Sequence, residues 1–191
     1  MTYTLNLQAF TDSIGELDLA KICGDNPDLR FETDKNGKLI IMSPTGSLTG
    51  ERNADLIYQV QFWNRQSKLG VVFDSSTGFR LFNGAIRSPD VSWIAIERWN
   101  SLNDEQKRGF APIDPDFVVE LLSPTDKLAE TQQKMREYMD CGVKLGWLIN
   151  PDSRKVEIYR NGREKEILES PSSVSGEDIL TGLNIDLTEI F

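Results

Sequence analysis

The sequence predicts an α/β fold, and three observations carry that prediction. The run Phe-Val-Val-Glu-Leu-Leu-Ser-Pro at 117–124 is short, apolar and closed by proline, as a strand covered on both faces would be. Two long segments with helical periodicity alternate with strand-like segments, and two Asn-Gly turns join runs typical of hairpins. With 191 residues and 39% hydrophobic content the chain can build one sizeable core, so we expect a single domain over 1–191.

The first third of the chain predicts an arm, a hairpin and a long helix. We expect a short arm and a helix in 1–22, followed by a hairpin over 29–42 around Asn36-Gly37. A helix over 49–68 ends before Gly70. Its side chains form two neighbouring, mainly apolar stripes, which predicts contacts on more than one side. The first stripe is Asn53, Leu56, Ile57, Val60 and Trp63, and the second is Ala54, Tyr58 and Phe62.

The middle of the chain predicts strands at 71–73, 78–82 and 87–94. Pro89 stands near the beginning of the last strand, where a missing N–H is tolerated. Alternation then places Asp90 on the same face as Ser92 and Ile94, opposite Val91 and Trp93. The following segment, 95–114, predicts a helical turn and a solvated loop, with the charge run 104–108 exposed.

The last third predicts a helix, a buried strand and a second hairpin. The helix runs from Ser123 to about Cys141 and is closed by Gly142, and the strand covers 143–151. The hairpin joins 155–160 to 164–168 around Asn161-Gly162. We expect the apolar tail from Gly176 to pack at the edge of the domain.

Glu120 is the residue that most needs explanation. A carboxylate in a strand covered on both faces costs several kcal/mol unless a cation or hydrogen-bond donors compensate it. The partner could be a metal, a lysine or an arginine. In the following helix Thr131, Lys134 and Tyr138 share a stripe, which aims Lys134 back toward the sheet.

Composition narrows the chemistry. The chain has no histidine, which excludes Ser-His-Asp and Cys-His nucleophile systems and every metal site that uses histidine. Cys23 and Cys141 are isolated, and no apolar run reaches the roughly 18 residues of a membrane span, so we expect a cytoplasmic protein without membrane contact. The net charge of −9 argues against broad nucleic-acid affinity but leaves room for a locally basic groove.

The sequence resembles the PD-(D/E)xK nuclease superfamily, in its restriction endonuclease branch of small proteins, over roughly residues 30–160. The matching motifs are Met-Ser-Pro-Thr-Gly at 42–46, Arg-Ser-Pro-Asp-Val-Ser-Trp-Ile at 87–94, Pro-Asp-Phe-Val-Val-Glu-Leu-Leu-Ser-Pro at 115–124, then Lys134, Tyr138, Gly142-Val143 and Trp147-Leu148-Ile149. The resemblance implies a restriction endonuclease-like core, a mixed β-sheet flanked by helices with additional hairpins. It also implies that Asp90 and Glu120 are metal ligands and that the reaction is phosphodiester hydrolysis.

The chain departs from the superfamily pattern in one respect. The common motif has a lysine two residues after the acid, whereas Leu121 and Leu122 follow Glu120 here, and Lys134 is the residue that takes the lysine's place. Acids on neighbouring strands suit a hard divalent cation, Mg²⁺ or Mn²⁺. The leading hypothesis is therefore a Mg²⁺-dependent endonuclease acting on DNA, with Asp90, Glu120 and Lys134 catalytic. Symmetric cutting of a duplex generally needs two sites, so a homodimer is expected.

Less specific interpretations stay open at this point. Glu120 could be a structural acid paired with Lys134 or an arginine, Asp90 a turn carboxylate, and Lys134 a surface lysine whose stem packs on the helix. Glu51 fits either an extra acid near the site or a carboxylate favoured by the helix dipole. For the whole protein the alternatives are a catalytically silent scaffold or interaction protein that keeps the nuclease fold, and a metal-dependent hydrolase of a small phosphate ester.

Overall fold

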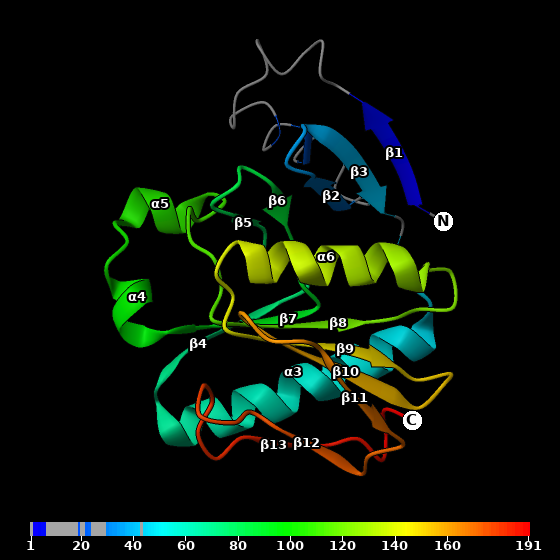
Figure 1. The fold of residues 1–191 in the computed structure, drawn as a ribbon. Helices are drawn as coiled ribbons and strands as arrows, with labels where there is room; N and C mark the ends of the chain where they lie inside the picture. The colour runs from blue at the N-terminus through cyan, green and yellow to red at the C-terminus, as the bar shows by residue number, and fades with distance from the viewer. Residues whose placement is uncertain (1, 7–18, 20–21, 24–29, 43) are drawn as a thin grey trace.

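A computed structural model gives the fold, and the structure describes residues 2–6, 19, 22–23, 30–42 and 44–191 (Figure 1). Its main feature is a central sheet of six strands in the order β11-β10-β9-β8-β7-β4. The strands β8 and β9 run parallel, and the other neighbouring pairs are antiparallel. In chain order they are β4 (Gly70–Asp74), β7 (Val91–Ala95), β8 (Phe117–Leu121), β9 (Leu145–Asn150), β10 (Lys155–Arg160) and β11 (Glu166–Glu169). The expected mixed sheet is confirmed.

Helices cover both faces of this sheet. The helix α3 (Ser47–Ser67) lies on one face together with β12 (Ser173–Ser175) and β13 (Asn184–Asp186), and α6 (Leu128–Asp140) lies on the other (Figure 1). The residues of β8 alternate between these layers: Phe117 and Val119 join the core under α3, and Val118 joins the core under α6. Glu120 therefore points toward the α6 side, two residues beyond Val118.

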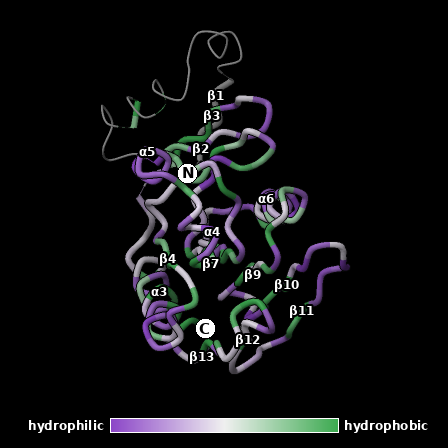
Figure 2. Tube along the Cα trace, turned by 90° about the vertical axis from the view of Figure 1, so that its left-hand side faces the viewer, coloured by the Kyte–Doolittle hydropathy of each residue, from purple (hydrophilic) through white to green (hydrophobic). Residues whose placement is uncertain are grey.

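A second, smaller sheet lies beyond α6, and Figures 1 and 2 both place α6 between the two sheets. Its strand order is β1-β3-β2-β6-β5, with every pair antiparallel. The strands are β1 (Thr2–Asn6), β2 (Arg30–Thr33), β3 (Lys38–Met42), β5 (Phe79–Arg80) and β6 (Ile86–Arg87). Buried Phe31, Leu39 and Ile86 form its core. Because α6 is sandwiched, its side chains can reach residues of both sheets.

Both predicted hairpins are confirmed. The strands β2 and β3 pair around Asn36-Gly37, and β10 and β11 pair across the turn that contains Asn161-Gly162. The glycines have φ values of 76° and 71°, in the left-handed region where a residue without Cβ is favoured. In the first turn the side chain of Asp34 also accepts hydrogen bonds from the N–H groups of Asn36 and Lys38.

The strand predicted over 87–94 is two strands that belong to different sheets. Its first part is β6, which pairs with β2, and its second part is β7, which pairs with β4 and β8. Pro89 has no N–H, and the N–H of Ser88 donates to the Glu32 side chain, so no ladder can continue between them. Asp90 therefore lies in the link just before β7 and not inside a strand.

The segment 95–114 contains the short helices α4 (Ile96–Asn100) and α5 (Asp104–Arg108). The charge run in α5 has no buried residue, as expected. The solvated-loop prediction is wrong after α5, because Ala111 and Ile113 are buried in the core under α6. The N–H of Arg80 donates to the carbonyl of Ala111, which fixes this loop to β5.

The helix α6 begins at Leu128, later than the predicted start at Ser123. The side chain of Asp126 accepts a hydrogen bond from the N–H of Ser123, which closes a turn ahead of the helix. The end is as predicted, since α6 stops at Asp140 and Gly142 has a φ of 100°. This late start leaves a loop between Glu120 and the helix that carries Lys134.

Two predictions about packing are also wrong. The second stripe of α3 is not covered, because Tyr58 and Phe62 are 62% and 54% exposed while Leu56 and Val60 of the first stripe are fully buried. The C-terminal tail from Gly176 is not confined to an edge. Together with Val174 of β12, its buried side chains complete the core under α3, namely Leu180, Leu183, Ile185, Leu187 and Ile190.

At the N-terminus, β1 forms where an arm was expected, and most of the helix predicted in 1–22 lies outside the described residues. Both cysteines carry free thiols, Cys141 buried and Cys23 partly buried. Within the described part of the chain, no helix has the length and apolar character needed to cross a membrane.

Candidate functional site

Asp90 lies directly before β7, beside the end of β8. Its Oδ2 accepts a hydrogen bond of 2.8 Å from the N–H of Leu121, and its Oδ1 accepts one of 3.2 Å from the side chain of Asn53 on α3. Burial raises the pKa of Asp90 more than the Leu121 N–H and the charge of Lys134 lower it. The structure thus brings this carboxylate next to the strand of Glu120, which sequence alternation alone could not establish.

Glu120 is buried on β8 and faces α6. Its Oε1 accepts a hydrogen bond of 2.9 Å from the hydroxyl of Tyr138, and the ammonium of Lys134 lies 2.8 Å from the same oxygen. Burial raises the pKa of Glu120 to about 7, against the attraction of Lys134 and reinforced by the charges of Asp90 and Glu32. No described residue donates a hydrogen bond to its Oε2.

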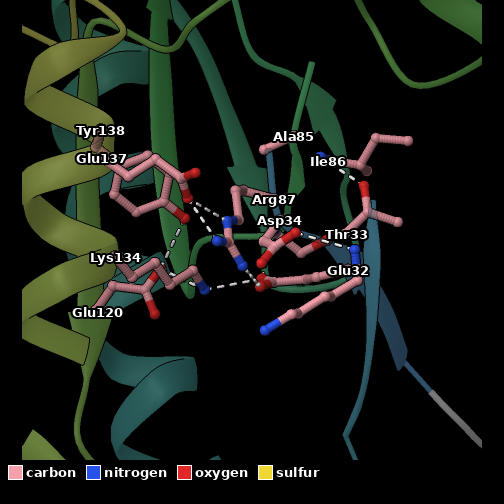
Figure 3. Close-up of polar contacts among 12 residues, drawn as sticks. Glu32, Thr33, Asp34, Ala85, Ile86, Arg87, Glu120, Lys134, Glu137 and Tyr138 are labelled. Carbon is pink, nitrogen blue, oxygen red and sulfur yellow. Dashed lines mark hydrogen bonds and ion pairs between the residues drawn. The ribbon is translucent and has the colours of Figure 1, made fainter. Parts of the chain in front are cut away.

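Lys134 projects from the middle of α6 toward the centre of this cluster (Figure 3). Its ammonium contacts Glu120 and also Glu32, where the distance from Nζ to Oε1 is 2.8 Å. Burial alone would lower the pKa of Lys134, but the charges of Glu120 and Glu32 outweigh it and raise the pKa above its ordinary value. The side chain is therefore an ammonium at neutral pH, with only 15% of its surface exposed. The predicted trio of Asp90, Glu120 and Lys134 is brought together.

Sequence reasoning missed the part of the cluster that comes from the small sheet. Glu32 of β2 accepts from the N–H of Ser88 at 2.9 Å and from Arg87 of β6 at 3.0 Å, in addition to Lys134. Arg87 in turn donates from Nε to Glu137 of α6 at 2.7 Å. Like Glu120, Glu32 is a carboxylate within a strand, and it follows the buried residue Phe31. The sequence nevertheless gave no reason to expect Glu32 to be buried, because one face of a hairpin strand is normally exposed.

In this acid cluster of six ionisable side chains, the acids outnumber the cations. The acids are Asp90, Glu120, Glu32 and Glu137, and the cations are Arg87 and Lys134. The pKa of Glu32 is lowered, because Lys134 and Arg87 together outweigh the effect of its burial. The pKa values of Asp90 and Glu120 are raised, mainly by burial, so these are the two acids that the cations of the cluster compensate least.

The donor set at these two acids fits a hard divalent cation. Mg²⁺ and Mn²⁺ prefer carboxylate and amide oxygens and are commonly held by one or two carboxylates while other positions remain open to water or phosphate. Two oxygens here have no hydrogen-bond donor in the described part of the chain: Oε2 of Glu120 and the buried Oδ1 of Asn53. The NH₂ group of Asn53 already donates to Asp90, which keeps this Oδ1 near the two acids. Among the described residues no group of three or more acids or cysteines lies close enough to form an all-protein metal cage.

Two other features of the surface lie apart from the acid cluster. Glu51 is exposed on α3, and no hydrogen bond or ion pair joins it to Asp90, Glu120 or Lys134 in the described chain. A cleft of about 420 Å³ between α3 and β4 is lined by Ile57, Gln61, Val72, Phe73, Asp74, Ser76 and Thr77, and so includes none of the predicted site residues.

Comparisons with known proteins agree with this fold. A solved structure described as "a putative nuclease belonging to DUF820 from Anabaena variabilis ATCC 29413" is 19% identical, with a TM-score of 0.71 over 84% of this chain and 89% of that chain. At this identity the likeness shows a shared fold. The sequence matches no curated protein.

The family assignment comes from the sequence itself. Residues 17–188 match the profile of the Uma2 family, whose description is "Putative restriction endonuclease". The match spans the central sheet, the small sheet except β1, and both long helices, and it confirms the resemblance to restriction-endonuclease-like proteins. The protein belongs to the Uma2 family.

Proposed function

We propose that this protein is a divalent-metal-dependent nuclease that hydrolyses phosphodiester bonds of DNA. The observation that carries the proposal is the pair Asp90 and Glu120, two adjacent carboxylates with raised pKa values beside a protonated Lys134. Glu120 is buried and Asp90 partly buried, and such a pair of acids is unfavourable unless a cation compensates it. Perturbed acids grouped in this way are typical of functional sites. The description of the family supports the reaction class.

Asp90 and Glu120 are the metal ligands in this proposal, and the metal is Mg²⁺ or Mn²⁺. When bound, such a cation supplies Lewis acidity toward a phosphodiester and lowers the pKa of the attacking water. The protein holds both acids in place. The Leu121 N–H and the Asn53 amide fix Asp90, while the Tyr138 hydroxyl fixes one oxygen of Glu120 and leaves the other free.

Lys134 acts as a fixed positive charge and not as a general base. Its pKa is raised by Glu120 and Glu32, so no free amine is present near pH 7 to accept a proton. An ammonium at this place orients the attacking water or offsets negative charge as it develops on the phosphate. Lys134 reaches Glu120 from α6, with Nζ 2.8 Å from Oε1, and in this proposal it takes the role of the lysine that the common motif has two residues after the acid.

A catalytically silent scaffold is the second candidate. It is favoured by the ion pairs of Lys134, which already satisfy the ammonium through Glu32 and Glu120, and by the net charge of −9. Under this proposal Glu120 is a structural acid, and its substitution changes stability without changing any binding or activity.

The test is incubation of the purified protein with supercoiled plasmid, single-stranded DNA, RNA and a chromogenic phosphodiester, each with Mg²⁺, Mn²⁺ or chelator. We expect nicking or cutting of DNA that needs the metal and falls at least about 100-fold in Asp90→Asn, Glu120→Gln and Lys134→Ala. Glu157→Gln is the matched control, because Glu157 is also buried and also hydrogen-bonded to α6, through Gln132.

The other outcomes separate the alternatives. Cleavage of the chromogenic ester with every nucleic acid left intact would assign a small phosphate ester as substrate. Intact substrates in all reactions, with a folded wild type, would favour the silent scaffold.

A further inference from the structure

Lys134 is held between carboxylates that belong to different sheets. Its Nζ lies 2.8 Å from Glu120 of the central sheet and 2.8 Å from Glu32 of the small sheet (Figure 3). Its ammonium also lies 5.8 Å from the centre of the Tyr138 ring, which adds a weaker attraction. Lys134 therefore has two carboxylate anchors, Glu120 and Glu32. In the proposed function one of them, Glu120, must also bind the metal.

The Glu32 anchor is built more firmly than the Glu120 anchor. Both oxygens of Glu32 are engaged, Oε1 by the N–H of Ser88 and Oε2 by Arg87, and the side chain is only 2% exposed. Arg87 is itself fixed by Glu137, whose other oxygen accepts a hydrogen bond of 3.0 Å from Asn83. Since Glu137 lies on α6, the chain of contacts returns to the helix that carries Lys134.

Glu120 has no comparable support. All its hydrogen bonds within the described chain go to Oε1, and its donors are Tyr138 and Lys134 itself. A carboxylate that engages a divalent cation loses much of its attraction for a neighbouring ammonium, because the cation repels that ammonium. A lysine held by Glu120 alone would then be displaced.

We infer that Glu32 is the positioning residue of Lys134, which keeps the ammonium beside Glu120 when Glu120 binds the metal. This inference rests on the proposed function and assigns the small sheet a part in it: β2 and β6 supply the Glu32–Arg87 anchor that completes the site. Glu32 acts through Lys134 and does not touch the substrate.

The first experiment measures the anchor without any substrate. Trace acetylation, read by mass spectrometry, gives the reactivity of Lys134 relative to exposed lysines such as Lys127, which is 77% exposed. We expect Glu32→Gln to raise the reactivity of Lys134 several-fold, while Glu120→Gln and the control Glu157→Gln leave it near the wild-type value. Unchanged reactivity in Glu32→Gln, or an equal rise in Glu120→Gln, would overturn the inference. If Glu32→Gln does not fold, Glu32→Asp is used in its place. This substitution keeps the charge, but the side chain is one methylene shorter, so its carboxylate lies farther from Lys134.

The second experiment is a double-mutant cycle on DNA cleavage. Glu32→Gln should lower kcat by about 10- to 100-fold, the usual effect of losing a group that orients a catalytic side chain, with KM and Mn²⁺ affinity nearly unchanged. In a Lys134→Ala background the same substitution should have no further effect on kcat. An equal loss in both backgrounds would mean that Glu32 has only a structural role.

The two experiments distinguish the failure of each idea. If wild type binds no metal and cuts nothing while Glu32→Gln still frees Lys134, the nuclease proposal fails and the anchor remains as a structural contact. If wild type is active and Glu32→Gln neither frees Lys134 nor lowers kcat, the nuclease proposal remains and Glu32 is not its positioning residue.

Discussion

At the scale of one residue, the burial of Glu120 makes its ionised form unfavourable, although the proposed metal site needs that form. Its ordinary pKa of 4.5 rises to about 7 in the folded protein, so the folded state binds a proton more tightly than the unfolded chain does. Stability is then lost as pH rises from about 4.5 to about 7, because ionisation is penalised only in the folded state.

The substitution Glu120→Gln should therefore leave the metal-free protein at least as stable as wild type at pH 8. The glutamine oxygen can still accept from Tyr138, and Lys134 keeps its ion pair with Glu32. The advantage should shrink toward pH 5, where Glu120 is already protonated in the folded wild type. Thermal melts in chelator at both pH values check this, and a mutant that is markedly less stable at pH 8 would show that ionised Glu120 stabilises the fold.

Asp116 has the opposite pKa shift. Its side chain is fully buried, and it accepts from the Ala95 N–H at 2.9 Å and pairs with Arg98 and Lys144 at 2.9 and 2.8 Å. Burial alone would raise its pKa, but these partners outweigh it and hold the pKa below the ordinary 3.8. The stabilisation is present above pH 3.8 and is lost as pH falls through the lower folded pKa.

We expect Asp116→Asn to lower the free energy of unfolding by about 1 to 3 kcal/mol at pH 7, with the two exposed cations limiting the loss because water can solvate them. Urea denaturation at pH 7 and near pH 3 measures the difference, which should be smaller in acid. A difference that grows in acid would contradict the assignment of Asp116 as an ionised structural acid.

Single residues also show what the sequence could predict about the site. Glu120 was identifiable because a charge in an apolar strand conflicts with local burial. Helical spacing aimed Lys134 toward the sheet, and the family resemblance made it the lysine of the site. Glu32 was not identifiable, because its contact with Lys134 joins residues 102 positions apart and depends on how the small sheet packs against α6. Asn53 gave a weak signal as the one amide in an otherwise apolar stripe.

At the scale of elements, sequence patterns predicted correctly those helices, strands and turns whose formation depends on neighbouring residues. The Asn-Gly hairpins and the apolar strand β8 formed as expected, because turn conformation and strand burial depend on neighbouring residues. The division of 87–94 into β6 and β7 was missed, since the choice between two sheets depends on partners far away in sequence.

The two stripes of α3 provide a prediction at this scale. Leu56 is fully buried, whereas Phe62 is 54% exposed, although both are large apolar residues of one helix. Leu56→Ala should lower the free energy of unfolding by about 2 to 5 kcal/mol, and Phe62→Ser should change it by less than about 0.5 kcal/mol. Chemical denaturation of both variants is the measurement. A large loss for Phe62→Ser would mean that another surface covers the second stripe in solution.

At the scale of the whole molecule, the C-terminal tail belongs to the main core. Its five buried side chains, together with Val174 of β12, pack in the same cluster as Phe117 and Trp147 of the central sheet. At roughly 1.5 to 3 kcal/mol for each buried aliphatic side chain, they contribute on the order of 10 kcal/mol, which is comparable with the total stability of an ordinary domain.

A chain that stops at Ser170 should therefore lack a cooperative thermal transition and near-ultraviolet circular dichroism. The control is Glu189→Gln, a change at an exposed position of the same tail that should melt like wild type. A truncated chain that melts cooperatively near the wild-type temperature would show that the central sheet does not need the tail. The single domain and the homodimer stay predictions at this scale.

The most direct test of the central claim is calorimetric titration of Mn²⁺ and Mg²⁺ into the metal-free protein, with wild type, Glu120→Gln and Glu157→Gln compared. The account predicts binding to wild type and to Glu157→Gln, and an affinity at least about tenfold weaker in Glu120→Gln, because Glu120 is a ligand and Glu157 is not. No binding to folded wild type, or equal binding to all three proteins, would contradict the assignment of Asp90 and Glu120 as a metal site.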